Sequence, residues 1–514
     1  MTGRPVIILI NAANSKAGGP FSAFSPVFPP VGLAMLAAVS EREGYTVHLI
    51  DQQITPDVMA AIPLHLLKNE TAVFGISMLT QAFTEARKLA EKIRSAFPEA
   101  RIVFGGMHPT ALPEEILQNT EADLVIRGEA EHTWIAWLDA VSTGKDWKNM
   151  AGISFRSGNQ LVHRPDAPLI ESLDTLPRFP YHYFRADKRY DLGIIVSSRG
   201  CRQQCSFCSN RIINRHTVRS FSTARVIAEI RLLEEQYGKT HILFLDDDFM
   251  GDSVRLHELS RGIQEAGLHL KLRFSFQARC DKVNPEIMDM LYQCGFRTVF
   301  FGIESAADHV LAGARKGAKL EDYSRAIRIS KDCGMDVQAS FIYGLPGETR
   351  QDRLLSLRFA LSQPISVAKF NNVVPYPGTN LYKQILSRSE LQFTPGYGNA
   401  NTLIPLTDGP FRRTPFPLLP EGTAQGELRR FIILSYMAFY LRKGRLKMMN
   451  SGKSDSIRWL YIRGSDGQLS PVKIFLLIHL LAVTAWKCLF LLLLPVKENY
   501  FIFLLRQKKQ GQHA

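Results

Sequence analysis

Cysteine is scarce in this chain, and its distribution excludes several classes of protein. Seven cysteines occur in 514 residues, and none precedes Cys201. So few thiols, together with a polar start at Met1 in place of a signal peptide, favour a reducing cytosol over a secreted, disulfide-linked protein. Four cysteines are scattered without CxxC pairing and are expected to be buried small apolar side chains. These are Cys280, Cys294, Cys333 and Cys488.

Acidic residues are outnumbered, and no nucleic-acid-binding motif accompanies the excess of basic ones. The formal net charge is +14, with local concentrations of Lys and Arg at 429–453 and 506–509. An anionic membrane surface or simple solubility explains this charge better than nucleic acid does. The length predicts several domains, and a hydrophobic content of 46 % is ample for their cores.

Three of the seven cysteines lie within eight residues, as Cys201, Cys205 and Cys208. The CxxxCxxC spacing provides three thiolates, which can hold a four-iron four-sulfur cluster by three corners and leave one iron open. A structural zinc site normally needs a fourth ligand, and no CxxC or Cys/His pair lies at a suitable distance to supply one. The motif therefore predicts a [4Fe-4S] cluster with a vacant position for a substrate or cofactor.

Residues 6–140 alternate short apolar runs with helical spacing. This alternation predicts an α/β fold with a doubly wound, Rossmann-like parallel sheet, whose ligands bind at the carboxyl ends of the strands. The expected strands are 6–10, 46–50, 72–76, 101–104 and 123–126, and the expected helices are 31–43, 81–97 and 113–120. The candidate binding loops after the strands are 11–30, 77–80, 105–110 and 127–131. Their glycines let the backbone approach a flat, bulky ligand.

A linker and small subdomain is expected over 146–190, with a strand at 152–156 and a turn at 158–159. The alternation then resumes from 192 to 374. Six strands with right-handed crossovers predict a (β/α)6 partial TIM barrel, with functional residues at the strand carboxyl ends. The expected strands are 193–197, 241–245, 273–277, 298–302, 336–342 and 365–371, and the expected helices are 224–237, 254–266, 285–294, 321–333 and 350–362.

The cysteine motif, with Phe207 just before its third cysteine, resembles the signature of the radical S-adenosylmethionine (SAM) enzymes. In that superfamily the open iron chelates SAM, and reductive cleavage yields a 5'-deoxyadenosyl radical. The loops of the preceding segment resemble those of the cobalamin-dependent radical SAM family, which includes the class B methyltransferases and the anaerobic Mg-protoporphyrin monomethyl ester cyclase group. The DxHxxG motif of other cobalamin proteins is absent, because Gly106 stands where its aspartate would precede His108. Many members of the family lack that motif and hold cobalamin without a histidine ligand.

This resemblance implies three sets of site residues. The cluster ligands would be Cys201, Cys205 and Cys208. The SAM contacts would be Phe207, Asp246, Asp248, Gln277, Arg279, Glu304, Ser305 and Pro346. The cobalamin contacts would be Ser77, Thr80, Gly105, Gly106, His108, Gly128 and Glu129. No catalytic side chain is identified.

Several of these residues have simpler interpretations. His108 could instead cap its loop by hydrogen bonds, and Asp246 and Asp248 could form an acidic turn at a helix N-terminus. Glu304 could cap the next helix, and the glycines and proline of 344–349 suit an ordinary turn. Tyr376, in a loop after the sixth strand, could face the active site or could simply be packed.

The C-terminal third predicts a mainly α-helical extension over 386–470, with a helix at 427–449, and a hydrophobic tail over 471–514. Within the tail, 474–494 is a nearly unbroken apolar run that contains Lys487. A spanning helix would place this lysine in the bilayer at a cost of about 2.5 to 3.5 kcal/mol. Attachment to the membrane surface is favoured for that reason, with a spanning helix and a buried core helix as alternatives.

The resulting hypothesis is a cytoplasmic, membrane-associated enzyme with a cobalamin-binding domain at 1–145 and a radical SAM core at 191–385. The family resemblance implies a C-methyltransferase that acts on an unactivated carbon of a lipid-like or tetrapyrrole substrate, through a 5'-deoxyadenosyl radical and methylcobalamin. The alternative is an oxidative cyclase that uses the radical without methyl transfer. The implied cofactors are the [4Fe-4S] cluster, SAM and cobalamin, and the implied partner is a reductant such as ferredoxin or flavodoxin. Nucleic acid is not an expected partner.

Overall fold

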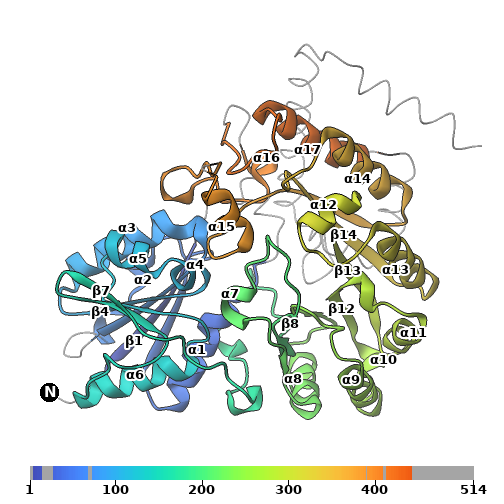
Figure 1. Cartoon of the computed structure of the whole chain (residues 1–514). Helices are drawn as coiled ribbons and strands as arrows, with labels where there is room; N and C mark the ends of the chain where they lie inside the picture. Colours follow the sequence, from blue (N-terminus) through green and yellow to red (C-terminus); the bar gives the residue numbers. More distant parts are fainter. Residues whose placement is uncertain are drawn as a thin grey trace, which may run out of the picture.

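Two large sheets organise the chain, one in each half, the first mixed and the second parallel (Figure 1). The computed structural model describes residues 4–13, 27–66, 72–388, 390–408, 413–440 and 442. In these ranges every strand and helix expected above is present, with ends that agree within two residues. The exception is the helix expected over 427–449, which ends at Tyr440, because Arg442 lies in a bend. The tail at 471–514, Cys488 and the part of the last expected helix beyond 442 lie outside the described residues.

The first sheet has the strand order β2-β1-β3-β4-β5-β6-β7. Its elements are β1 (Val6–Ala12), α1 (Val31–Arg42), β2 (Val47–Asp51), α2 (Val58–Ala61), β3 (Ala72–Met78), α3 (Phe83–Ala96), β4 (Arg101–Gly105), α4 (Met107–Ala111), α5 (Pro113–Asn119), β5 (Leu124–Ile126), α6 (Glu131–Thr143), β6 (Ile153–Ser157) and β7 (Gln160–His163). Strands β2 to β5 run parallel to β1, as the alternation of strand and helix requires.

Helices cover both faces of this sheet. Alternate residues of β1 face opposite sides, so Ile7 and Leu9 pack with α1 and α6, while Ile8 and Ile10 pack with α3 and α5. Because both faces are buried at the centre of the sheet, β1 and β3 are apolar along most of their length, which is typical of parallel strands. Only the edge formed by the strand carboxyl ends remains for a ligand.

The first sheet extends further than the sequence indicated. Strand β6 pairs antiparallel with β5, and β7 pairs antiparallel with β6. Residues 153–163 therefore belong to this sheet, although they were expected in a linker and subdomain. A short hairpin is visible in the sequence as a strand and a turn, but its residues carry no signal for the strand that it joins.

The second sheet has six parallel strands in the order β15-β14-β13-β12-β11-β8, which forms the expected partial TIM barrel. Its elements are β8 (Ile194–Ile195), α8 (Thr223–Glu235), β11 (His241–Phe244), α9 (Ser253–Glu265), α10 (Leu268–Lys271), β12 (Arg273–Ala278), α11 (Pro285–Gln293), β13 (Phe296–Glu304), α12 (Asp308–Gly313), α13 (Leu320–Asp332), β14 (Asp336–Tyr343), α14 (Arg350–Ser362) and β15 (Val367–Asn372).

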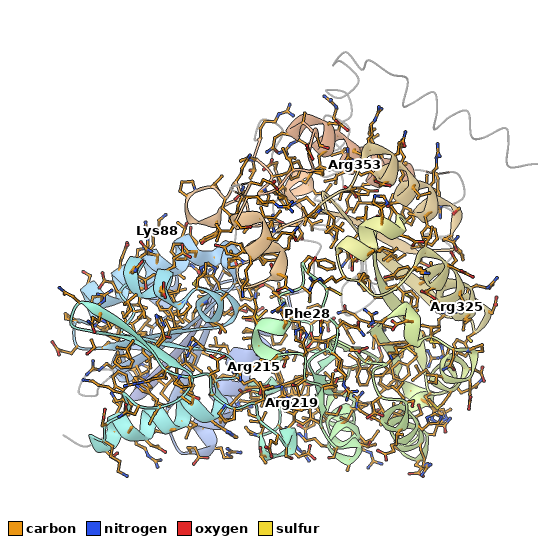
Figure 2. The ribbon with its side chains drawn as sticks, viewed as in Figure 1. Phe28, Lys88, Arg215, Arg219, Arg325 and Arg353 are labelled. Carbon is orange, nitrogen blue, oxygen red and sulfur yellow. The ribbon has the colours of Figure 1, made fainter. Side chains whose placement is uncertain are left out.

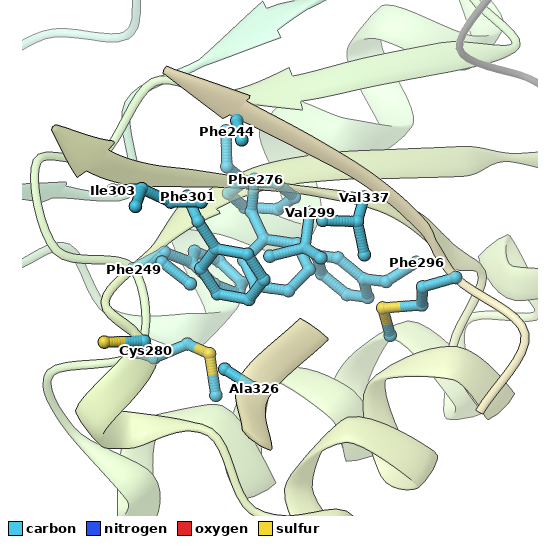
Figure 3. Packing of buried hydrophobic residues seen from close by; sticks show 14 of the residues in the cluster. Phe244, Phe249, Phe276, Cys280, Phe296, Val299, Phe301, Ile303, Ala326 and Val337 are labelled. Atoms are coloured by element: carbon cyan, nitrogen blue, oxygen red, sulfur yellow. The ribbon is translucent and has the colours of Figure 1, made fainter. Parts of the chain in front are cut away.

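A cluster of phenylalanines packs the outer face of this sheet against its helices (Figure 3). Phe296 lies at its centre, with its ring centroid 5.0 Å from that of Phe274 and 5.4 Å from those of Phe249 and Phe276. Cys280 and Cys294 are buried in the same core, as expected for small apolar side chains, whereas Cys333 is half-buried.

The C-terminal extension begins at the end of α15 (Asn380–Leu386) and contains α16 (Ile404–Thr407) and α17 (Gln425–Tyr440). Strand β15 is an edge strand, and α17 covers it. The Phe370 backbone N–H donates to the Tyr436 hydroxyl at 3.0 Å, and the Tyr440 hydroxyl donates to the Ala368 carbonyl at 3.0 Å. Two tyrosine hydroxyls thus occupy backbone groups of an edge that would otherwise be open to another strand.

The extension also contacts the first domain, and Figure 1 shows it lying across both halves. Tyr397 donates to Glu115 at 2.7 Å, and Thr84 donates to the Gly396 carbonyl at 3.2 Å.

In the described ranges no helix is long and apolar enough to cross a membrane.

Candidate functional site

The cysteine motif forms a loop beside the first strand of the barrel. Strand β9 (Ser198–Arg199) pairs antiparallel with β10 (Arg219–Ser220), and the cysteines lie between them in sequence. Gly200 has a φ of +95°, and a Cβ there would clash with the Thr217 carbonyl oxygen, so this turn requires glycine. Cys205 is buried, while Cys201 and Cys208 are half-buried.

The thiols are in a desolvated environment. Burial raises the pKa of Cys201 to about 11 and also raises the pKa of Cys208. These thiols would be protonated at neutral pH unless a metal displaced their protons. Among the described residues no three Cys, His, Asp or Glu side chains converge as they would on a single metal ion. Three thiolates that each bind a different iron of a cluster do not need to converge on one point.

Two cations lie next to this loop. Lys316 Nζ is 5.8 Å from the Phe207 ring centroid and 2.9 Å from Glu304 Oε1. Burial lowers the pKa of Lys316, but the charges of Glu304 and Cys205 outweigh burial, and the pKa is raised overall. Arg279 donates from Nη2 to the Lys316 carbonyl at 3.1 Å. Burial lowers the pKa of Arg279, but Asp281 and, to a smaller extent, Cys205 outweigh burial and raise it overall. Each of these cations is also 2.9 Å from a carboxylate, Lys316 from Glu304 and Arg279 from Asp281, so the two would balance only part of the negative charge of a cluster and its thiolates.

Glu304 ends β13 in an unusual conformation. Its φ is +67°, and the pairing of β13 with β14 shifts between Gly302 and Glu304. A non-glycine residue with positive φ at an irregularity of this kind is strained, and a bulge redirects the side chain. Ser305, the next residue, is fully buried, and its Oγ accepts a hydrogen bond from the Ala307 backbone at 3.2 Å.

The three aspartates after β11, at 246–248, have different surroundings. Asp246 is fully buried and accepts hydrogen bonds from the Ser197 backbone at 2.7 Å and from the Ser198 hydroxyl at 2.7 Å, and Arg255 lies 3.2 Å from it. Its carboxylate is therefore occupied within the protein. Asp247 accepts from the Gly200 backbone at 2.9 Å and so holds the cysteine loop.

Asp248 differs from its two neighbours. Within the described part of the chain its buried Oδ1 has no hydrogen-bond partner. Burial raises its pKa, and Arg279 opposes that rise. A buried polar atom without a partner normally requires an explanation, and a bound ligand with an amino group would provide one.

The remaining residues expected at SAM lie at the same ends of neighbouring strands. Gln277 is exposed near the end of β12, and Pro346 is half-buried in the loop after β14. In that loop the Gly344 backbone, with a φ of +99°, donates to Glu348 at 2.6 Å. The strand ends thus bring together residues that the sequence places far apart.

The loops expected at cobalamin lie at the carboxyl edge of the first sheet. Gly105 is the last residue of β4, Gly106 follows it, and Gly128 lies in the loop after β5. Ser77 is the last residue but one of β3, and Thr80 lies in the loop after that strand. Gly106 has a φ of +95°, and a Cβ there would lie 3.0 Å from Ser77 Oγ and 3.1 Å from the Met78 carbonyl oxygen. Glycine therefore allows these two loops to lie against each other.

An exposed apolar side chain at this edge was missed by the sequence reasoning. Leu79 follows β3 directly, and 56 % of its surface is accessible. It lies in the loop between Ser77 and Thr80. A large apolar side chain left open beside glycine loops is compatible with an apolar, flat ligand.

His108 is enclosed by protein and does not point to open solvent. Its Nδ1 lies 3.3 Å from Thr80 Oγ1, and its Nε2 lies 3.4 Å from Glu115 Oε2. Its ring contacts those of Phe83 and Tyr397, with centroids 5.5 and 5.0 Å away. The side chain is buried at the contact between the first domain and the C-terminal extension, which no local sequence pattern indicates.

Glu129 also has protein partners. Its carboxylate accepts hydrogen bonds from Arg219 at 2.6 Å, from Arg199 at 3.1 Å and from the Ile170 backbone at 3.0 Å. Burial raises the pKa of Glu129, but these partners outweigh it and lower the pKa overall. Arg219 lies where the two domains meet in Figure 2, so Glu129 joins the first domain to the strands that flank the cysteine loop.

Comparison with known proteins gives two family matches. Residues 195–360 match the radical SAM superfamily, and residues 22–137 match the B12 binding domain. An uncharacterized methyltransferase of Pyrococcus horikoshii is 30 % identical, over 80 % of this chain and 88 % of the relative. The anaerobic magnesium-protoporphyrin IX monomethyl ester cyclase of Cereibacter sphaeroides is 23 % identical, over 84 % and 69 %. The solved structure of OxsB, a cobalamin-dependent SAM radical enzyme, has the same fold, with a TM-score of 0.68, 16 % identity and coverage of 99 % of this chain and 80 % of OxsB.

Proposed function

The chain belongs to the cobalamin-dependent radical SAM family, and we propose that it transfers a methyl group to an unactivated carbon of a lipid-like or tetrapyrrole substrate. The observation that carries this proposal is that the carboxyl edge of the first sheet lies next to the cysteine loop of the partial barrel. Glu129 in the first domain pairs with Arg199, and Arg199 directly precedes the loop of Gly200 and Cys201. Two cofactors bound at these edges would be neighbours.

The cluster would be held by Cys201, Cys205 and Cys208, whose burial and nearby cations fit an anionic metal cluster. For SAM we propose Phe207, Asp248, Gln277, Arg279, Glu304, Ser305 and Pro346. Asp248 is favoured over Asp246 for the amino group, because Asp246 is satisfied by serines and Arg255 whereas Asp248 has an unpartnered buried oxygen.

Cobalamin would lie on the carboxyl edge of the first sheet. Ser77, Thr80, Gly105, Gly106 and Gly128 would contact it through short side chains and backbone, with Leu79 against an apolar face of the ring. We propose that Glu129 acts as a positioning residue, since arginines occupy its carboxylate. We propose the same role for His108, whose ring packs against Phe83 and Tyr397 and whose buried Nε2 has no hydrogen-bond partner among the described residues. When bound, the cluster and SAM supply the radical, and cobalamin supplies the methyl group.

The protein's own residues would fix the geometry and exclude water. Asp247 holds the cysteine loop through Gly200, and Lys316 holds Glu304 at the strained end of β13. These contacts are buried, so each hydrogen bond is made in a low-dielectric environment where it orients strongly. The same residues would keep the two cofactors at a fixed separation.

The domain limits follow the pairing of the strands. We propose a cobalamin domain that reaches 163 rather than 145, because β6 and β7 continue its sheet. The radical SAM core would then include 191–385, followed by the extension at 386–470.

For the tail at 471–514 we propose attachment to an anionic membrane surface. Flotation of the full chain with anionic vesicles but not with neutral ones would support attachment, and equal behaviour with both would refute it.

The methyl-transfer proposal is tested by anaerobic reconstitution with iron, sulfide and cobalamin, followed by addition of SAM that carries a trideuterated methyl group. In this assay and in those below, dithionite supplies the electrons for reductive cleavage of SAM. A cell extract from a strain without the gene supplies the substrate. A product that gains one trideuterated methyl group supports methyl transfer. The relative from Cereibacter sphaeroides favours cyclisation as the second candidate, and a product that loses hydrogen or gains oxygen without the label would support it instead.

A further inference from the structure

Lys369 lies on the inner face of the partial barrel. Alternate residues of a strand face opposite sides, and Ala368 and Phe370 are buried in the core that the outer helices cover. Lys369, between them, is exposed on the other face. Its Nζ lies 5.5 Å from the ring centroid of Phe300 on β13, which is possible only if both side chains leave the same face of the sheet.

The surroundings of the Lys369 ammonium differ from those of the other enclosed cations. Lys316, Arg255 and Arg429 each lie within 3.2 Å of a carboxylate oxygen. For Lys369 no carboxylate partner occurs among the residues that the structure describes, and its contact there is the Phe300 ring. Burial lowers the pKa of Lys369 although its side chain is exposed. A lowered pKa together with an exposed side chain is expected where the side chain is open to solvent on one side and surrounded by protein on the others.

The strand register places Lys369 within reach of the SAM site proposed above. Ser340 on β14 lies beside Lys369, and Gly302 on β13 lies beside Ser340. The Ser340 hydroxyl donates to Glu304 at 3.4 Å. Because neighbouring strands are about 4.8 Å apart, Lys369 lies about 10 Å from the strand that ends in Glu304. A molecule of several bonds' length can span that distance.

We propose that Lys369 binds an anionic oxygen group, a carboxylate or a phosphate ester, of the methyl-accepting substrate. This inference rests on the proposed function and adds a chemical class to its substrate. The Phe300 ring attracts the ammonium but accepts no conventional hydrogen bond, so the donors of Lys369 remain for a ligand. An anion would replace the solvation that the ammonium has lost. It would also fix one end of the substrate while the other end faces SAM.

The test begins with the extract used above, separated by anion exchange into anionic and neutral fractions. Each fraction is incubated with the reconstituted full-length enzyme and trideuterated SAM, and 5'-deoxyadenosine is measured alongside the labelled product. Label in the anionic fraction is the expected result. Phosphatase treatment then distinguishes the two sources, because loss of the acceptor indicates a phosphate ester and its survival indicates a carboxylate. Label in the neutral fraction alone overturns the inference while leaving methyl transfer intact.

Two variants at the lysine and one matched control complete the test. Lys369→Met should raise the KM for the active fraction at least about tenfold, equivalent to the loss of one charged contact. Lys369→Arg should retain most of the affinity. Lys271→Met, which removes an exposed lysine paired with Glu234, should change nothing. Formation of 5'-deoxyadenosine without substrate should be equal in all four proteins, which shows that cluster and SAM are in place. An unchanged KM in Lys369→Met overturns the inference, whereas absence of 5'-deoxyadenosine in the wild type overturns the proposed function itself.

A second measurement does not depend on turnover. Acetylation of the wild-type protein by a low dose of acetic anhydride is followed by peptide mass spectrometry, with and without inorganic pyrophosphate. Pyrophosphate should protect Lys369 more than it protects Lys271. Equal protection of both lysines would show that the anion responds to the general positive charge, and would overturn the inference.

Discussion

The two large sheets of this protein differ in how many of their faces are buried. Both faces of the first sheet are covered by helices, so Ile7 and Ile8, which point in opposite directions, are both fully buried. The second sheet is covered on its outer face, while Gln277 and Lys369 on its strands remain exposed. The first sheet can therefore hold a ligand only at its edge, whereas the second can also hold one against its inner face. The first sheet is therefore suited to holding a cofactor at its edge, and the second to holding a substrate against its inner face.

The largest effect should come from the cysteine loop. Cys205→Ala removes one of three proposed cluster ligands, so iron content and formation of 5'-deoxyadenosine should fall to background. The control is Cys294→Ala, which removes a fully buried cysteine of the barrel core outside the motif. Iron analysis and visible absorbance after anaerobic reconstitution measure the outcome. Equal iron content in the two variants would contradict the assignment of the cluster.

The contact between the domains should be the next most sensitive feature. Glu129→Gln leaves Arg219 buried without its carboxylate, and breaking a buried ion pair of this kind costs about 3 to 5 kcal/mol. The control is Asp166→Asn, which removes a half-exposed partner of Arg127 and should cost less than about 1 kcal/mol. Chemical unfolding measures both. A similar, small loss of unfolding free energy in the two variants would show that the network does not join the domains.

A variant at Gly106 tests the proposed cobalamin site of the first sheet separately from the barrel. Gly106→Ala places a Cβ against Ser77 and Met78 at a positive φ, so cobalamin occupancy should fall and stability should decrease by about 1 to 3 kcal/mol. Gly144→Ala is the matched control, because Gly144 also has a positive φ but has open space around it. It should retain cobalamin and show only the backbone cost. The amount of cobalamin per chain, read from absorbance after desalting, decides between the two.

The smallest effect concerns a buried carboxyl behind the barrel. Burial raises the pKa of Glu348 to about 8, against Arg353, which Figure 2 labels near α14. The folded state then holds a proton that the unfolded state releases above its ordinary pKa. This contribution to stability is present at low pH and is lost as the pH rises to about 8. Glu348→Gln should flatten the decline of Tm between pH 6 and pH 8, and an unchanged slope would contradict the assignment.

The sequence predicted the elements well because both sheets are built from clear patterns. Apolar runs such as 72–76 and amphipathic spacing such as 254–266 are local signals, and the structure follows them. The cysteine loop was also a local signal, carried by the spacing of three residues.

The features that were missed are contacts between distant segments. Glu129 and Arg219 are 90 residues apart, and no local pattern shows that their side chains meet. The same is true of His108 with Tyr397, of Tyr436 with the edge of β15, and of the hairpin that completes the first sheet. Two predicted contacts, Asp246 and Glu129, therefore have partners within the protein. Lys369 could not be singled out either, because its isolation depends on which face of a curved sheet is left open.

One measurement tests the central claim most directly, namely that both edges serve one reaction. The reconstituted wild-type enzyme is incubated with trideuterated SAM and the active extract fraction, and labelled product and 5'-deoxyadenosine are counted in the same reaction. The account predicts that, once the 5'-deoxyadenosine formed without substrate is subtracted, the two appear together in equal amounts. Both should require the cluster, and the labelled product should also require cobalamin. Labelled product without 5'-deoxyadenosine, or 5'-deoxyadenosine with an unlabelled product, would contradict it.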